Sequence, residues 1–132
     1  MVYLVDDDVD DLEFVQEALV TNSYKGPVDT ASNGQQLMER LITTTAKPDV
    51  IILDLNMPLL DGFQALHQIK SNPDLSRIPV IILTASASKE DEVRCLALGC
   101  QSYFQKPNRL DLYRDLVTTV KGIIRQRRGN AL

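Results

Sequence analysis

The sequence has no long apolar run, few cysteines and no excess of positive charge, and each shortage excludes a class of protein. No apolar run approaches the roughly 18 residues of a membrane span, and no signal-peptide pattern precedes the first acidic cluster. The two cysteines, Cys95 and Cys100, form no disulfide framework, which predicts reduced thiols used in packing. A net charge of −4 and a pI of about 4.9 disfavour a general nucleic-acid binder. We therefore expect a cytoplasmic protein that binds neither membrane nor nucleic acid.

The length and composition are those of one globular domain. The chain has 132 residues, 44% of them hydrophobic and 24% charged, which is enough to bury a core. The sequence contains no linker, internal repeat or low-complexity segment, and its last predicted element is a helix. We therefore expect a single domain over residues 1–132, with no attached output domain.

Five short segments have the composition of β-strands. Residues 50–53 and 80–83 are continuous, β-branched apolar runs, as expected for strands of a parallel sheet covered on both faces. Residues 2–5, 28–31 and 102–105 are weaker runs of the same kind.

Amphipathic helical patterns lie between and after these segments. The fourth begins near Ser88 and stops at Gly99, and the fifth runs from about Asn108. The predicted inward positions of the five helices are, in order, Leu12, Val15, Ala18 and Leu19; Leu37, Met38, Leu41 and Ile42; Phe63, Leu66 and Ile69; Val93, Leu96 and Ala97; Leu112, Leu116, Val120 and Ile123.

The strand–helix unit therefore occurs five times, which predicts a doubly wound α/β domain. Right-handed crossovers leave few topologies, and a flavodoxin-like, five-stranded parallel sheet with strand order 2-1-3-4-5 is favoured. In that order the first and third strands are neighbours, and ligands bind beyond the carboxyl ends of the strands.

Polar residues follow four of the predicted strands. The first strand leads into an acidic run, and the other ends carry Asp54, Thr84 and Lys106. Helix capping explains part of the acidic run, namely Asp8 with Asp10 and Asp11, but not Asp6 and Asp7. Two unit charges 4 Å apart repel by about 4 kcal/mol at an effective dielectric constant of 20. Asp6, Asp7 and Asp54 would therefore gather only around a cation, and hard oxygen ligands suit Mg²⁺.

Asp54 ends a buried apolar strand, where an unpaired carboxylate is costly. Capping of the third helix is one role open to it; the other is that of a nucleophile that forms an aspartyl phosphate. A divalent ion, Lys106 and the Thr84 hydroxyl would then stabilise the transferring phosphoryl group.

These residues resemble the signature of two-component response-regulator receivers. The matching pieces are Asp6-Asp7, Thr84-Ala85, Lys106-Pro107, and the phosphorylation-site stretch 54–58 followed by Asp61-Gly62. The resemblance covers essentially the whole chain.

The resemblance implies a role for each matching residue. Asp54 is the phosphoacceptor and, with Asp7 and the backbone carbonyl of Asn56, binds Mg²⁺ directly, whereas Asp6 acts through a metal-bound water. The third aspartate, Asp8, leaves open whether Asp6 and Asp7 or Asp7 and Asp8 form the metal pair.

Three further residues have roles implied by the resemblance. Lys106 pairs with the phosphoryl group, Thr84 turns its hydroxyl towards it, and Tyr103 occupies the switch-aromatic position. The family also implies a cis peptide bond between Lys106 and Pro107.

The resemblance also implies partners. The phosphoryl donor is a sensor histidine kinase or a phosphotransfer protein. A downstream protein, or a second copy of the chain in a homodimer, reads the face made by the fourth helix, fifth strand and fifth helix. The segment 22–27 is long, as in stand-alone receivers that partner bacterial phytochromes, and Gln101-Ser102 replaces an acidic pair common in DNA-binding regulators. The protein catalyses only its own phosphorylation and dephosphorylation, so we do not class it as an enzyme.

Three other functions compete with this interpretation. Phosphatases of the haloacid dehalogenase type normally have a second Asp two residues after the nucleophile, where this chain has Asn56. Flavodoxins need a phosphate-cradling loop after the first strand, where five aspartates would repel the flavin phosphate. A receiver that signals without phosphorylation would not need the intact site. The lone histidine, His67, is expected at the surface of a helix or half-buried in it. The helix macrodipole accounts for the basic tail 124–128, for which docking or nucleic-acid binding is the alternative.

Overall fold

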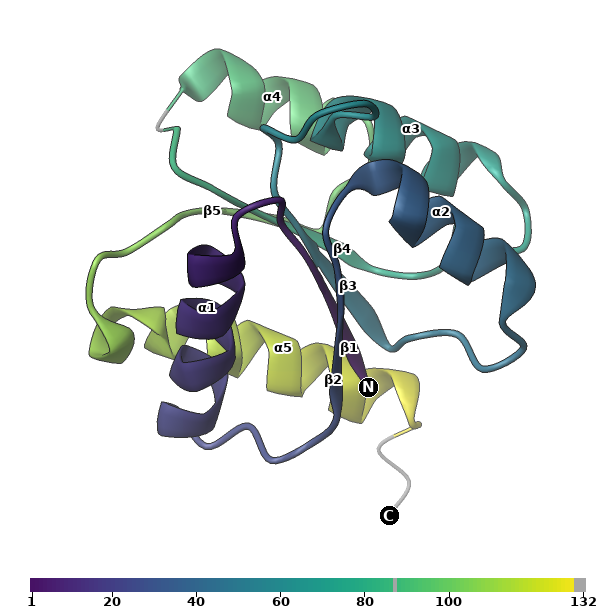
Figure 1. Cartoon of the computed structure of the whole chain (residues 1–132). Helices are drawn as coiled ribbons and strands as arrows, with labels where there is room; N and C mark the ends of the chain where they lie inside the picture. Colours follow the sequence, from purple (N-terminus) through teal and green to yellow (C-terminus); the bar gives the residue numbers. More distant parts are fainter. Residues whose placement is uncertain (87, 130–132) are drawn as a thin grey trace.

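The computed structural model describes residues 1–86 and 88–129 and contains one five-stranded parallel sheet in the order β2-β1-β3-β4-β5. This confirms the predicted flavodoxin-like fold (Figure 1). The strands are β1 (Val2–Val5), β2 (Val28–Ala31), β3 (Val50–Leu53), β4 (Val80–Thr84) and β5 (Ser102–Gln105). The helices are α1 (Val9–Thr21), α2 (Gly34–Thr43), α3 (Gly62–Ser71), α4 (Lys89–Ala97), the 3₁₀ helix η1 (Leu110–Tyr113) and α5 (Arg114–Arg127).

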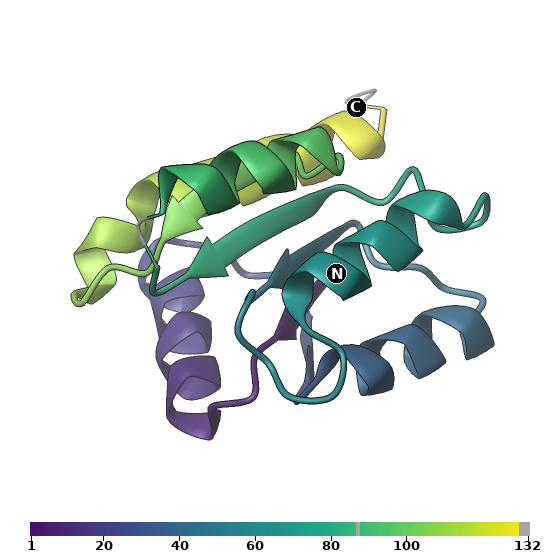
Figure 2. The ribbon, with the colours of Figure 1, turned by 90° about the horizontal axis from the view of Figure 1, so that it is seen from above.

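Two layers of helices cover the two faces of the sheet. Helices α2, α3 and α4 lie on one side, the side from which Figure 2 is seen, and α1 and α5 lie on the other (Figure 1). Alternate residues of one strand enter opposite cores: Ile51 and Leu53 pack with α2 and α3, whereas Val50 and Ile52 pack with α1 and α5. Both faces of β3 are therefore buried, which is why its sequence is continuously apolar.

The start of the fifth helix differs from the sequence prediction. A 3₁₀ turn, η1, precedes α5, and Leu112 is 53% exposed while Tyr113 is 2% exposed. Because a 3₁₀ turn advances 120° per residue instead of 100°, the inward face shifts by one position. The later inward positions Leu116, Val120 and Ile123 are buried as predicted.

Four other predicted inward residues face outward. In α2 the buried stripe ends at Leu41, and Ile42, one residue further round the helix, is 65% exposed. In α4 only Cys95 is buried; Val93 and Leu96 are about half exposed, and Ala97 is exposed as well. Helix α4 packs against the edge strand β5, so it buries a narrower stripe than the spacing of its apolar residues predicts.

Candidate functional site

The first and third strands bring two buried aspartates together at the carboxyl end of the sheet. Val5 of β1 is paired in register with Leu53 of β3, and each is followed by an aspartate. The amide of Asp54 donates to the carbonyl of Val5 at 3.0 Å, which holds the two strand ends side by side. Asp6 is 3% exposed and Asp54 is 6% exposed, so both carboxylates are largely removed from water.

Asp7 completes an acidic cluster with this pair. Asp6, Asp7 and Asp54 each present a carboxylate oxygen within 4.8 Å of those of the other two, and Asp7 is the exposed member. Three hard oxygen donors with one open, solvent-facing side fit a divalent cation that keeps part of its water shell. Asn56, the fourth predicted ligand, lies exposed in the loop that follows Asp54.

Asp8 has a different task from its two acidic neighbours. Its carboxylate accepts hydrogen bonds from the amides of Asp10 at 2.9 Å and Asp11 at 3.2 Å, and so caps the N-terminus of α1. Its own amide donates to the Asp6 carboxylate at 3.0 Å. The geometry therefore favours Asp6 and Asp7 as the pair that faces Asp54.

Lys106 reaches into the acidic cluster from the end of β5. Its Nζ atom lies 2.7 Å from Asp6 Oδ2, 2.8 Å from Asp11 Oδ2 and 3.5 Å from Asp54 Oδ2. Burial alone would lower the pKa of Lys106, but hydrogen bonds to Asp11 and Asp6 and the charge of Asp54 outweigh it and raise the pKa. The lysine therefore stays charged beside Asp54.

Asp11 was assigned only a capping role from the sequence, yet it is one of the closest partners of Lys106. One carboxylate, that of Asp8, suffices to cap α1. The signal that could have identified Asp11 is thus the surplus of acidic residues in the first turn over what capping needs.

The raised pKa values of Asp54 and Asp6 show that burying these two carboxylates in their charged form is costly. The pKa of Asp54 is raised to about 6, because burial and the charge of Asp6 raise it by more than Lys106 and the amides of Asn56 and Leu55 lower it. Burial also raises the pKa of Asp6, although its hydrogen bond to Lys106 opposes this. A bound divalent cation would relieve this cost.

Ser86 connects the two predicted switch residues. Thr84 ends β4 with no exposed surface, and its hydroxyl oxygen lies 3.4 Å from the amide of Ser86. The hydroxyl of half-buried Tyr103 donates to the carbonyl of the same Ser86 at 3.3 Å. The backbone after β4 thus contacts both side chains, a link that the sequence alone does not reveal.

The loop after Asp54 is held by close backbone packing. The amide of Gly62 donates to the carbonyl of Leu55 at 2.9 Å, and a Cβ atom on Gly62 would lie 2.4 Å from the carbonyl oxygen of Asp54. Asp61 caps α3 through a capping box with Gln64. The capping alternative for Asp54 is therefore wrong, because Asp61 performs that role.

The expected cis bond before Pro107 is also wrong in this structure. No peptide bond within residues 1–86 or 88–129 is cis. An X–Pro bond favours trans by roughly 0.5–1 kcal/mol unless tertiary contacts select the other isomer.

Comparison with known proteins identifies this arrangement. The family model for the response regulator receiver domain matches residues 2–118. The chain belongs to the response regulator receiver family. The receiver is 35% identical over 128 residues to the response regulator Rcp1 of Synechocystis, covering 93% of this chain and 85% of Rcp1. It is 34% identical to the transcriptional regulatory protein PrrA of Mycobacterium leprae, covering 98% of this chain but only about half, 52%, of PrrA.

Solved structures agree with this assignment. The phosphorylated cyanobacterial phytochrome response regulator RcpA superimposes with a TM-score of 0.80 at 33% identity, over 91% of this chain and 89% of RcpA. The Mn²⁺-bound form of Rcp1 has a TM-score of 0.76 at 35% identity, over 94% of this chain and 91% of Rcp1. The receiver is therefore a two-component signalling domain, and its acidic cluster is consistent with divalent-metal binding.

Two other expectations bear on what the receiver contacts. His67 lies exposed on α3, as predicted, and takes no part in the acidic site. Within the described residues, no helix combines the length and the apolar composition required to cross a membrane.

Proposed function

We propose that the receiver accepts a phosphoryl group on Asp54 from a sensor histidine kinase or a phosphotransfer protein. An Asp54 carboxylate oxygen attacks phosphorus, and the bond from phosphorus to the donor's histidine nitrogen breaks as the acyl phosphate forms. The observation that carries the proposal is the buried carboxylate of Asp54 with Lys106 Nζ 3.5 Å away and two further carboxylates beside it.

The metal proposed here is Mg²⁺, held by Asp7, Asp54 and the backbone carbonyl of Asn56, with Asp6 acting through a bound water. Its chemistry would be to neutralise charge on the phosphoryl oxygens. Asp6 is already engaged by Lys106 and by the amide of Asp8, which supports an indirect role for its carboxylate.

Lys106 and Thr84 act on the phosphoryl group itself. Lys106 is held in place by its amide, which donates to the carbonyl of Thr84 at 2.7 Å, so the two residues are positioned together. The lysine is shared among three carboxylates and can transfer its Asp54 contact to a phosphoryl oxygen without losing the other two partners. The buried Thr84 hydroxyl can rotate to donate to the same group.

The signal leaves through the face formed by α4, β5 and α5. When the Thr84 side chain moves its hydroxyl oxygen towards the phosphoryl group, the hydrogen bond that this oxygen accepts from the Ser86 amide is lost, and the Ser86 carbonyl is also what holds the Tyr103 hydroxyl. Tyr103 can then change rotamer and alter that face for a downstream protein or a second copy of the chain. No outside substrate is turned over, so the receiver acts as a switch and not as an enzyme.

The kinase that we propose is one linked to a phytochrome. This finer assignment is supported by the names of the similar proteins, which include a phytochrome response regulator. The phosphatase alternative is disfavoured because the position two residues after Asp54 is Asn56, which lacks an acid–base carboxyl group.

The test is phosphorylation by acetyl phosphate with Mg²⁺, followed by intact mass measurement. One acid-stable, alkali-labile phosphoryl group is expected on the wild type and none on Asp54→Asn. Asp8→Asn is the matched control, because Asn also caps a helix and this change removes one nearby carboxylate outside the proposed metal set. Undiminished labelling of Asp54→Asn would refute the assignment of the acceptor.

A further inference from the structure

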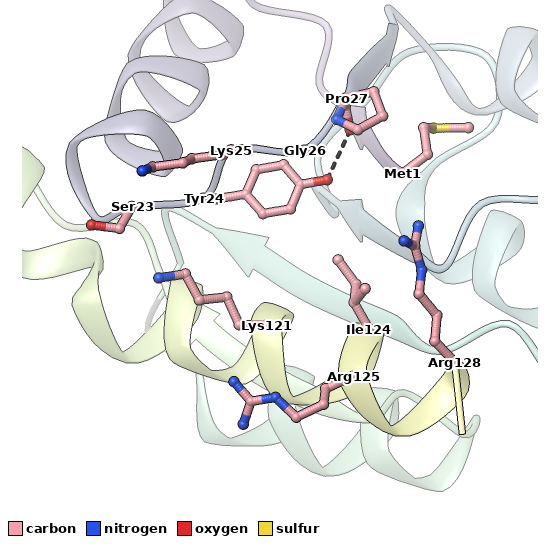
Figure 3. Close-up of a pocket in the computed structure, with 10 residues that line it drawn as sticks. All are labelled: Met1, Ser23, Tyr24, Lys25, Gly26, Pro27, Lys121, Ile124, Arg125 and Arg128. Carbon is pink, nitrogen blue, oxygen red and sulfur yellow. Dashed lines mark hydrogen bonds between the residues drawn. The ribbon is translucent and has the colours of Figure 1, made fainter. Parts of the chain in front are cut away.

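A pocket lies at the amino end of the sheet, opposite the phosphorylation site. It has a volume of about 320 Å³ and lies between the α1–β2 loop and the second half of α5 (Figure 3). Its lining is basic and apolar, with residues from the loop facing residues from the helix. These are Met1, Ser23, Tyr24, Lys25, Gly26, Pro27, Lys121, Ile124, Arg125 and Arg128.

Four cationic side chains surround this pocket in a chain whose net charge is −4. Arg128 is paired with Asp49 at 3.1 Å. Among the described residues, no carboxylate forms an ion pair with the other three, Lys25, Lys121 and Arg125. Within the described residues, the pocket therefore has three cationic side chains without an ion-pair partner.

The helix macrodipole explains only part of this charge. It favours cations in the last turn of α5, which contains Arg125. Lys121 lies more than a turn before the end of the helix, and Lys25 belongs to the loop on the opposite side of the pocket (Figure 3). Two elements distant in sequence thus direct cations at one cavity.

The loop wall of the pocket is rigidly built. The Tyr24 hydroxyl donates to the carbonyl of Pro27 at 2.9 Å, and the amide of Tyr24 donates to Leu19 at 2.8 Å (Figure 3). A Cβ atom on Gly26 would lie 2.4 Å from the Tyr24 hydroxyl, so the loop closes this tightly only with glycine there. A wall that is already ordered costs little further conformational entropy when a ligand binds.

We propose that this pocket binds a small organic anion that carries two or more negative charges on phosphate or carboxylate groups. Lys25, Lys121 and Arg125 would contact the charged groups, and the apolar surfaces of Pro27 and Ile124 would contact the carbon skeleton. The cavity lies at the lower end of the size range of small-molecule sites. The cationic side chains line a concave pocket between a loop and a helix, which favours a small ligand over a flat lipid surface.

The test is a titration of metal-free receiver with inorganic pyrophosphate and, separately, with citrate, followed by amide NMR. Saturable shifts are expected at Lys25, Gly26 and Lys121 with at least one of the two anions. Lys25→Gln and Arg125→Gln should each weaken binding about tenfold. Lys89→Gln is the matched control, since it removes an equal charge from the start of α4.

Three outcomes would overturn the proposal. They are the absence of saturable shifts at the pocket with both anions, an equal loss of affinity in Lys89→Gln, and binding only to vesicles that contain phosphatidylserine. The folded state of each variant is checked by the unchanged dispersion of its amide spectrum.

Discussion

Asp7 is the member of the acidic cluster whose removal can be interpreted most simply. Asp6 accepts hydrogen bonds from Lys106 and from the amide of Asp8, so changing Asp6 breaks contacts as well as removing repulsion. Asp54 is the proposed acceptor. The exposed carboxylate of Asp7 has no hydrogen-bond or ion-pair partner in the described part of the chain, so its substitution tests charge alone.

Asp7→Asn should stabilise the metal-free receiver by up to about 1 kcal/mol, because it removes an exposed charge near two buried ones. The same change should weaken Mg²⁺ binding by at least about tenfold. Thermal melts with and without Mg²⁺ measure both effects, since bound metal raises the melting temperature by mass action. Asp8→Asn should leave the Mg²⁺ response nearly intact. A wild-type melt indifferent to Mg²⁺ would count against the metal site.

The raised pKa of Asp54 predicts how metal-free stability depends on pH. The pKa is 3.8 in the unfolded chain and about 6 in the folded protein, so between these values the folded state binds more protons. Asp54 therefore contributes to the free energy of unfolding below about pH 4, and this contribution is lost as pH rises through 6. The free energy of unfolding should fall by on the order of 2–3 kcal/mol over this range.

Urea denaturation of metal-free wild type and Asp54→Asn at pH 5, 6 and 7 measures this dependence. The stability difference between the two proteins should grow in favour of Asp54→Asn as pH rises. Saturating Mg²⁺ should reduce that growth, because the cation stabilises the charged carboxylate. A difference that is constant across the three pH values would contradict the raised pKa.

At the scale of elements, η1 decides which side chain enters the core before α5. Tyr113 packs edge-on against Phe14, with ring centroids 5.8 Å apart, and its hydroxyl lies 3.4 Å from the carbonyl oxygen of Pro107. The neighbouring Leu112 is mostly in water. The 3₁₀ turn thus anchors the segment after Lys106 to α1, beside the phosphorylation site.

Tyr113→Ala should therefore destabilise the receiver by on the order of 3 kcal/mol, as the loss of a buried aromatic does. Leu112→Ala, a matched apolar truncation one residue away, should change stability by less than about 0.5 kcal/mol. Urea denaturation midpoints compare the two variants. Equal destabilisation would mean that Leu112, and not Tyr113, faces the core.

At the scale of the whole molecule, the two ends of the sheet carry opposite charge. The carboxyl end gathers the aspartates and Lys106, and the amino end has the basic pocket beside α5. Helix α4 and strand β5 lie at one edge of the sheet, and α4 carries two exposed apolar side chains, Val93 and Leu96. An exposed apolar surface next to a phosphorylation switch is suited to partner binding.

Beryllofluoride, a stable phosphoryl mimic, should therefore change the self-association or the partner affinity of the receiver by about 1–3 kcal/mol. Arg94, Asp111 and Arg114 are expected to contribute with Tyr103, although Arg94 also stacks on Phe63 at 4.0 Å. Sedimentation and pull-downs with and without the mimic measure the change, and Asp54→Asn is the control. Identical association constants with and without beryllofluoride would contradict the proposed switch.

Much of this receiver was readable from the amino-acid sequence. Two β-branched apolar runs and three weaker ones predicted all five strands, and the rule of right-handed crossovers predicted their order. Once that order is known, Asp6, Asp54, Thr84 and Lys106 must stand at one edge, because the carboxyl ends of parallel strands share it. These inferences depend on local composition and on chain topology, both of which are properties of the sequence.

Other features were decided only by tertiary packing. Lys106 meets Asp11 across 95 residues of sequence, and Lys25 faces Lys121 across a pocket that neither element forms alone. Tyr113 points into the core because it ends a 3₁₀ helix, and the spacing of apolar residues in the sequence does not reveal that helix. In each case the contact depends on how two elements pack against each other. The spacing of side chains along one element does not tell which residue of another element lies opposite.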